Sequence, residues 1–153
     1  KYEGEFKQNK FNGHGAYYYH NGTKYIGGFK DNKRHGKGYE VFHLGSTHEG
    51  EYVSGQKHGF GSFIGYNGSK YTGMYKEGMF DGFGIYHYPN GAKYVGYFSQ
   101  GKSEGIGMMS YNKDSHSYMG EWKEDKREGF GVYYYINEGE EPLTCNERGT
   151  IEY

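Results

Sequence analysis

Apolar and polar residues alternate with a period of two along much of the chain, as they do in β-strands that bury one face. In residues 1–7, Tyr2 and Phe6 fall on one side of this alternation, while lysines and glutamates fall on the other. Asn9 follows, a residue that favours tight turns. A second alternating run then leads to Asn21-Gly22, a pair typical of hairpin turns. The first residues of the chain therefore predict one β-hairpin.

This hairpin pattern recurs at a spacing of 23 residues four times and of 24 residues once. Aligned on the first aromatic position, six repeats start at Tyr2, Tyr25, His48, Tyr71, Tyr94 and Tyr118. Counted from each start, positions 3, 12 and 14 are always glycine, and position 5 is always aromatic. The repeats cover residues 1–139. Residues 140–153 leave the pattern and are expected to form a divergent connection, followed by either a final strand or the start of another repeat.

Two strands in each of six repeats predict twelve antiparallel strands, with each repeat touching only its neighbours. The expected fold class is all-β, as an elongated, twisted single antiparallel sheet of tandem 23-residue β-hairpins. At about 4.8 Å per strand the sheet would be roughly 58 Å long.

Glycine inside strands normally weakens them, so its fixed positions need a packing reason. Positions 12, 14, 16 and 18 are expected to share one face, where the two glycines leave bare backbone for the rings of positions 1 and 5 to cover. Part of each ring is expected to stay exposed and to bind partner protein segments. The residues proposed for this role are Tyr25, Phe29, Tyr52, Tyr71, Tyr75, Tyr94, Phe98, Tyr118 and Trp122.

Composition changes this picture in one respect. Glycine numbers 29 of 153 residues and the aliphatics are few, which alone would favour disorder. Disordered chains, however, combine high net charge with few aromatics, whereas here the net charge is -1 and 20% of residues are aromatic.

No apolar run approaches the roughly 18 residues of a membrane span. The single cysteine, Cys145, cannot form a disulfide within the chain, so the chain is expected to be cytoplasmic.

No enzymatic chemistry is expected from the sequence. None of the six Gly-x-Gly pairs is followed by Lys-Ser or Lys-Thr, so a phosphate loop and a nucleotide cofactor are not predicted. Histidines at equivalent positions of adjacent repeats would lie about 10 Å apart, too far to share one zinc ion. A site that combines Cys145 with a histidine of a second chain stays open as the less favoured alternative.

Basic residues gather near the first turn of each repeat, where acidic residues are interspersed. A solvated turn is the favoured interpretation. Anionic membrane lipid is the alternative, with one candidate cluster formed by Lys30, Lys33, Arg34 and Lys37. A pI near 6.8 argues against nucleic acid.

Self-association to a homodimer is predicted from two features. Residues 1–101 carry a net charge of +4 and residues 102–153 carry -5, which favours antiparallel or head-to-tail contact. Unpaired strand edges at the ends of the sheet invite another strand.

Repeat 4 carries the clearest signature of a known family. It reads YTGMYKEG at residues 71–78, FDGFGIY at 80–86 and PNG at 89–91, and it resembles the MORN (membrane occupation and recognition nexus) repeat. His48 departs from this pattern because it replaces the first tyrosine of repeat 3. The resemblance covers about 138 residues in six copies.

The resemblance implies a fragment of a longer non-catalytic scaffold in a cytoskeletal, cell-division or membrane-associated assembly. The alternative that it implies is a regulatory or phosphoinositide-targeting module of an enzyme.

Overall fold

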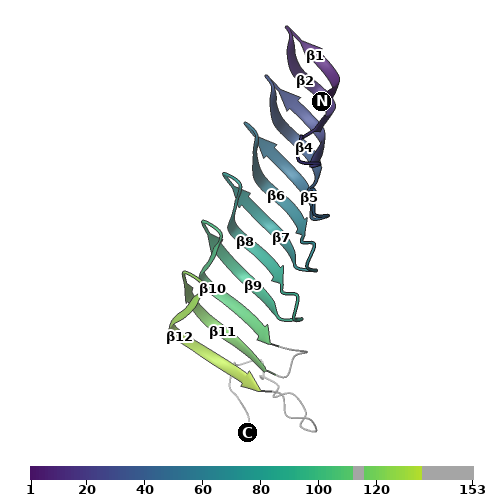
Figure 1. Ribbon diagram of the computed structural model, residues 1–153. Helices are drawn as coiled ribbons and strands as arrows, with labels where there is room; N and C mark the ends of the chain where they lie inside the picture. The colour runs from purple at the N-terminus through teal and green to yellow at the C-terminus, as the bar shows by residue number, and fades with distance from the viewer. Residues whose placement is uncertain (112–115, 136–153) are drawn as a thin grey trace, which may run out of the picture.

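The computed structural model describes residues 1–111 and 116–135. These residues form one twelve-stranded antiparallel sheet in which the strands follow one another in chain order, without crossovers (Figure 1). The strands are β1 (Tyr2–Lys7), β2 (Lys10–Tyr18), β3 (Lys24–Lys30), β4 (Lys33–Val41), β5 (Thr47–Val53), β6 (Gln56–Ile64), β7 (Lys70–Lys76), β8 (Met79–His87), β9 (Lys93–Ser99), β10 (Lys102–Tyr111), β11 (His116–Lys123) and β12 (Lys126–Tyr135). The predicted fold class is confirmed. The expected final strand lies in residues outside the described part.

The first turn of every repeat is a two-residue loop in which both residues have positive φ, as in Asp31 (47°) and Asn32 (68°). This is the type I′ geometry, whose twist matches the twist of the flanking strands. The turn also binds the preceding repeat, because the amide of its second residue donates to the carbonyl at position 10 of that repeat. An example is the bond from Gly78 N to Lys57 O, 2.9 Å long. Neighbouring repeats are thereby held in register at this edge.

The second turn is stabilised by its asparagine. Asn67 Oδ1 accepts a hydrogen bond from Ser69 N (3.1 Å), and Asn90 Oδ1 accepts one from Ala92 N (3.0 Å). The residue after the turn glycine is buried, which anchors the loop to the sheet. The Asn-Gly pairs thus act as the sequence predicted.

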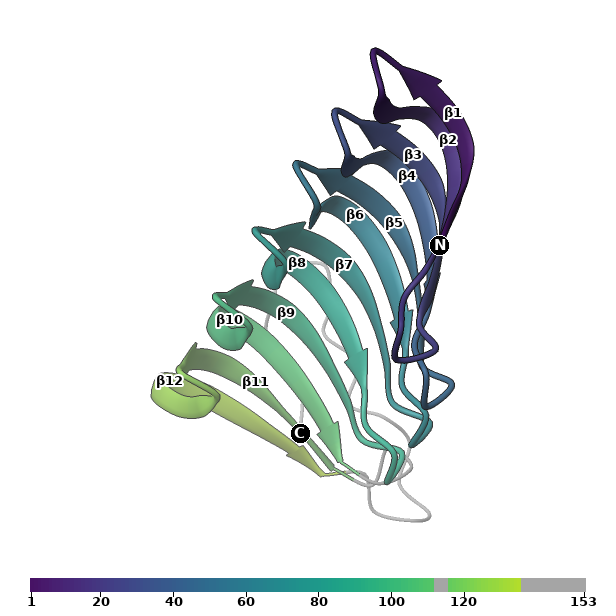
Figure 2. The same cartoon turned by 45° about the horizontal axis from the view of Figure 1, so that its top comes forward.

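A register shift interrupts each hairpin just after position 3, as between Gly73 and Tyr75. On the facing strand, the glycine at position 12 has a positive φ in all six repeats, for example 70° at Gly105. Residues with a side chain rarely adopt a positive φ, so this backbone conformation favours glycine at position 12. The expectation that position 12 leaves space beneath a ring was therefore wrong, and at Gly105 a side-chain carbon would meet nothing within 4 Å. The strands bend strongly along their length (Figure 2).

The core lies on the face of the sheet that carries positions 1 and 5, which we call the inner face. Its buried rings form one cluster around Tyr25, Phe29 and Tyr52 and a second that runs from Tyr71 to Trp122. Rings of consecutive repeats meet edge to face, as do Tyr94 and Trp122, whose centroids are 5.3 Å apart. Aromatic pairs favour this geometry. Rings therefore take the place of an aliphatic core, as expected.

Candidate functional site

The floor of the inner face is built from the tyrosine of position 1 and the glycines that it covers. The Tyr94 ring lies against Gly107, where an added Cβ would be 2.5 Å from the Tyr94 Cζ. The Tyr94 hydroxyl donates to Tyr97 O at 3.1 Å, and the Tyr71 hydroxyl donates to Met74 O at 2.7 Å. Burial raises the pKa of Tyr94 to about 12, so this donor keeps its proton at ordinary pH. The predicted pairing of ring and glycine is present at positions 3 and 14.

The nine rings proposed as a partner-binding surface form this floor and are buried. Their exposed fractions range from 0% for Tyr25, Tyr52, Tyr71 and Tyr94 to 8% for Phe98. The expectation that part of each ring remains exposed was wrong for these residues. The side chains of positions 10, 16 and 18 cover them, as when the Phe80 ring stacks on Tyr71 with centroids 3.7 Å apart.

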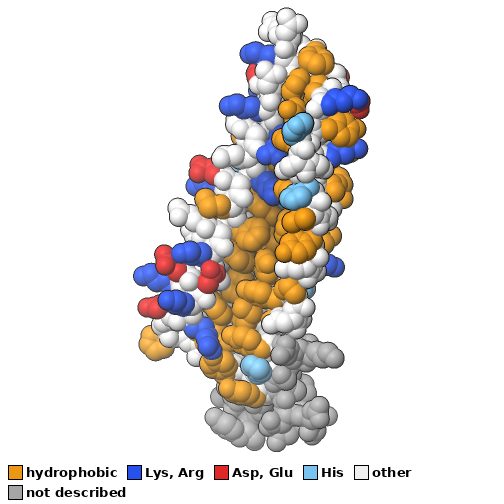
Figure 3. All heavy atoms as spheres, in the orientation of Figure 1, with side chains coloured by type: hydrophobic (Ala, Val, Ile, Leu, Met, Phe, Trp, Pro, Cys, Tyr) orange, Lys and Arg blue, Asp and Glu red, His pale blue; other side chains and the backbone are white. Residues whose placement is uncertain are grey.

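The side chains of positions 10, 16 and 18 form the accessible surface of the inner face. Most of them are half-buried, and Tyr133 and Tyr135 at the last repeat are exposed by 41% and 69%. Together with the rings beneath, they make an apolar strip between the two rows of turns (Figure 3). We call this strip the trough. At the last repeat the trough holds an open depression of about 460 Å³, lined by Met109, Tyr111, Trp122, Asp125, Lys126 and Arg127.

Charged residues interrupt the trough at repeats 2 and 3. Arg34 Nη1 donates to Glu40 Oε1 at 2.6 Å, while Arg34 Nη2 donates to Gly55 O at 2.7 Å. The second oxygen of Glu40 accepts from the Tyr52 hydroxyl at 3.1 Å. Burial, reinforced by Glu40, raises the pKa of Tyr52. The guanidinium also lies over the Tyr52 ring, 4.9 Å from its centroid. The polar atoms of Arg34, Glu40 and Tyr52 therefore form one hydrogen-bonded network on the inner face.

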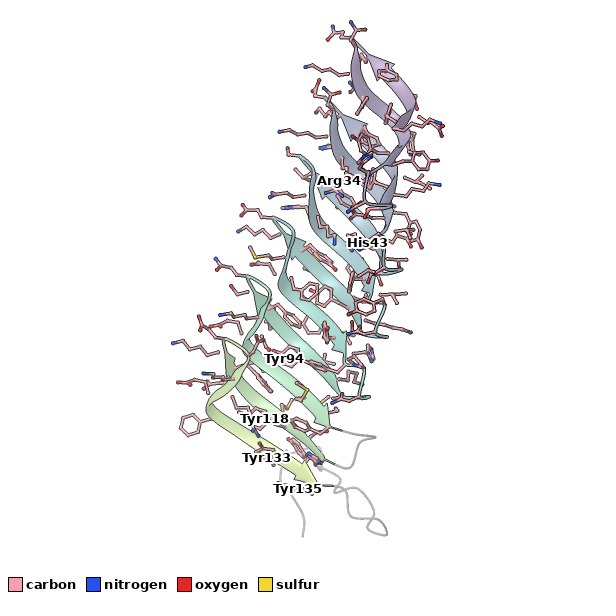
Figure 4. All side chains as sticks on the ribbon, viewed as in Figure 1. Arg34, His43, Tyr94, Tyr118, Tyr133 and Tyr135 are labelled. Atoms are coloured by element: carbon pink, nitrogen blue, oxygen red, sulfur yellow. The ribbon has the colours of Figure 1, made fainter. Side chains whose placement is uncertain are left out.

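Arg34 was one of four cations in the alternative lipid-binding cluster, but it points into the trough (Figure 4). Lys30, Lys33 and Lys37 are exposed on the opposite, outer face. The structure therefore separates Arg34 from the other three cations.

His48 stands at position 1 of repeat 3 and is 1% exposed. Neither ring nitrogen has a hydrogen-bond partner among the described residues, and neither does the hydroxyl of Tyr75, whose ring centroid is 4.9 Å away. Burial, with smaller effects of Lys57 and Arg34, lowers the pKa of His48 to about 3. The buried imidazole is therefore neutral at ordinary pH.

The outer face of repeats 3–6 carries an apolar set that the sequence analysis missed. Phe83 and Tyr97 face each other across β8 and β9, with ring centroids 5.7 Å apart. These side chains are about half exposed, and so are others on the same face: Phe60, Met74, Ile106, Met119 and Val132. Their alternation with the buried positions would have placed them on this face. Around repeats 2 and 3, this face holds an open depression of about 620 Å³.

The family model for the MORN repeat matches residues 2–24, 25–46, 48–70, 71–93, 94–115 and 118–140. The chain belongs to the MORN-repeat family. A comparison with curated proteins gave no match. Membership indicates an interaction scaffold for proteins or membranes, and the MORN repeat is generally a non-catalytic module.

Metal-binding groups and membrane-spanning helices are two further features that bear on function. Within residues 1–111 and 116–135, no three His, Cys, Asp or Glu side chains gather as a metal site would require. Cys145, the candidate ligand at a dimer contact, lies outside this part. No described segment forms a helix long and apolar enough to cross a membrane.

Proposed function

We propose that this chain is a non-catalytic scaffold whose trough binds partner protein segments. The observation that carries the proposal is the apolar strip of positions 10, 16 and 18 in repeats 3–6, which no other part of residues 1–111 and 116–135 covers. Binding surfaces favour aromatic residues and methionine, and Phe63, Tyr86 and Met109 supply these here. The buried rings beneath support the surface and do not themselves touch the partner. The assembly it serves is cytoskeletal or membrane-associated.

Affinity capture from native cells tests this proposal when it is combined with matched variants. The variant Tyr86→Ser with Met109→Ser changes the trough, whereas Phe83→Ser with Ile106→Ser makes the same kind of change on the outer face. Loss of the captured partner only in the trough variant is expected, with both variants folded by circular dichroism. Equal retention in both variants, or loss only in the outer-face variant, would overturn the proposal.

Self-association through an end of the sheet is part of the same proposal. β1 pairs only with β2 in the described sheet, so its other edge carries unpaired backbone groups. Light scattering should give twice the monomer mass of 17.6 kDa. A mass of one chain at every concentration contradicts the homodimer.

A second candidate is the phosphoinositide-targeting module of an enzyme. The exposed Lys30, Lys33 and Lys37 on the outer face favour it, since each lysine near an anionic surface contributes about 1 kcal/mol. Flotation with phosphoinositide vesicles should then be lost in Lys33→Ala with Lys37→Ala. Absence of flotation in the unchanged protein would remove this candidate.

A further inference from the structure

Lys57 is a cation without a counterion inside the trough. It occupies position 10 of repeat 3, and its Nζ lies 5.0 Å from the Phe42 ring centroid and 5.7 Å from the Phe63 centroid. Its side chain is half-buried, and desolvation lowers its pKa. No carboxylate of the described residues lies within 4.0 Å of it. A desolvated charge of this kind gains from an anionic partner.

Glu40 is the acidic residue of the inner face near Lys57, but its oxygens are already taken. One accepts from Arg34 at 2.6 Å and the other from the Tyr52 hydroxyl at 3.1 Å. Arg34, Lys57 and Glu40 together leave one positive charge at this end of the trough. The charge therefore favours an anionic group from outside the chain.

A second cation marks the other end of the trough. Arg127 occupies position 10 of repeat 6, with its guanidinium carbon 5.6 Å from the Tyr118 ring centroid and 5.3 Å from that of Tyr133. It forms no ion pair within the described residues. Asp125 lines the same depression, and its Oδ1 accepts from both the amide and the hydroxyl of Ser103. Because no carboxylate of the described residues lies within 4.0 Å of Arg127, its guanidinium can still pair with a carboxylate of a partner.

Between these two cations the described trough is mainly apolar, and the acidic side chain that borders it there, Asp125, is held through its Oδ1 by Ser103. Position 10 is Phe80 in repeat 4 and Ser103 in repeat 5, while position 16 contributes Phe63, Tyr86 and Met109. A complementary segment would therefore have an apolar stripe with an acidic residue at each end.

The backbone of the sheet favours a helix over an extended segment as the partner that binds in the trough. The trough runs across the strands, and their amides and carbonyls are paired in the ladders on both sides. An extended segment along the trough would find no backbone partners, whereas a helix satisfies its own. Six strand steps of about 4.8 Å separate Lys57 from Arg127, which gives about 29 Å. Eighteen residues of helix make five turns and span about 27 Å, so they return to the same face.

We infer that the trough of repeats 3–6 binds an amphipathic helix that carries two carboxylates about 18 residues apart, one for Lys57 and one for Arg127. This inference rests on the proposed function and specifies the chemistry of the partner. The two cations fix the position of the helix along the trough, and the apolar stripe between them supplies contact area.

The test uses three synthetic 24-residue amphipathic helices with the same Leu/Ala stripe. They carry Glu, Gln or Lys at both of two positions 18 residues apart. Binding to the whole chain is measured by calorimetry and by the fluorescence of Trp122, the single tryptophan, whose Nε1 donates to Gly107 O beneath the trough. The Glu peptide should bind at least tenfold more tightly than the Gln peptide, and the Lys peptide should bind most weakly.

Variants of the chain connect this preference to the two cations. Lys57→Gln and Arg127→Gln should each halve the logarithm of the affinity ratio between the Glu and Gln peptides. Lys57→Arg keeps the positive charge and should keep the full ratio. Lys76→Gln is the matched control, because Lys76 is exposed outside the trough, and it should leave the preference unchanged. Equal binding of the Glu and Gln peptides, or a preference that survives both Gln variants, overturns the inference. Binding by none of the peptides overturns it too, while the capture experiment with the trough variants separately decides the proposed function.

Discussion

Acidification should destabilise this protein through His48. The unfolded chain presents this imidazole with a pKa near 6.5, whereas the folded value is about 3. Below about pH 6.5 the unfolded state therefore binds a proton that the folded state excludes. The free energy of unfolding then falls by up to about 1.4 kcal/mol per pH unit, until the folded pKa is reached. Between pH 7.5 and 5.0 the loss from this residue is about 2 kcal/mol.

The substitution His48→Tyr isolates this effect. Tyrosine occupies position 1 in the other five repeats, and the Tyr71 hydroxyl there donates to the carbonyl of position 4 at 2.7 Å. The variant should gain this bond with Glu51 O and lose two unpartnered nitrogens. It should be more stable than the unchanged protein by about 1 kcal/mol at pH 7.5.

Urea unfolding at several pH values measures the predicted difference. Carboxylates titrate in both proteins, so their contributions cancel when the two curves are subtracted. The advantage of His48→Tyr should grow by about 2 kcal/mol between pH 7.5 and 5.0. A constant difference across this range would show that the imidazole binds a proton as readily in the folded as in the unfolded state, which refutes the account of its burial.

Three further predictions concern the inner face. Gly107→Ala should lower the free energy of unfolding by about 2–3 kcal/mol, because its Cβ would overlap the Tyr94 ring. Gly105→Ala should lower it by only about 1 kcal/mol through backbone strain. Equal decreases in the melting temperature of the two variants would contradict this. Tyr94→Phe should cost about 1 kcal/mol by removing a hydroxyl bond of 3.1 Å, and an unchanged unfolding midpoint would argue against that bond. Glu40→Ala should cost about 3 kcal/mol because it leaves the Arg34 charge unpaired, and adding Arg34→Met should recover part of the loss; no recovery would mean that the ion pair does not carry the effect.

The sequence alone predicted the fold because local and repeated signals agree. The period-two alternation, the Asn-Gly turns and the 23-residue spacing each required the same hairpin, so the order of the strands followed without long-range information. The pairing of the Tyr94 ring with Gly107 could also be inferred, because a ring needs bare backbone to cover.

Other features depend on geometry that residue types do not encode. The glycine at position 12 looked like part of the bare patch, but Gly105 is required by a bulge and its positive φ of 70°. The nine floor rings were expected to be partly exposed because the count of aromatics did not reveal which rings lie on top. The side chain at position 10 determines which rings are covered. Phe80 stacks over Tyr71, and Arg34 pairs with Glu40 on the inner face, apart from the lysines of the expected basic cluster.

The outer apolar set was missed for a related reason. Alternation places residues such as Phe83 and Phe60 on the face opposite the core rings, but it does not show which of them are neighbours. The register of the folded sheet does, because it pairs Phe83 with Tyr97 and Phe60 with Met74. The partner itself is not encoded in the fold, because its identity depends on another chain.

Site-specific photo-crosslinking tests the central claim, that the trough is the binding surface, most directly. A benzophenone side chain is placed at Tyr86 or Tyr111 in the trough and, as a matched position, at Phe83 on the outer face. The account predicts that illumination links the captured partner to the trough positions and not to Phe83. Crosslinks at Phe83 with none at the trough positions would contradict it.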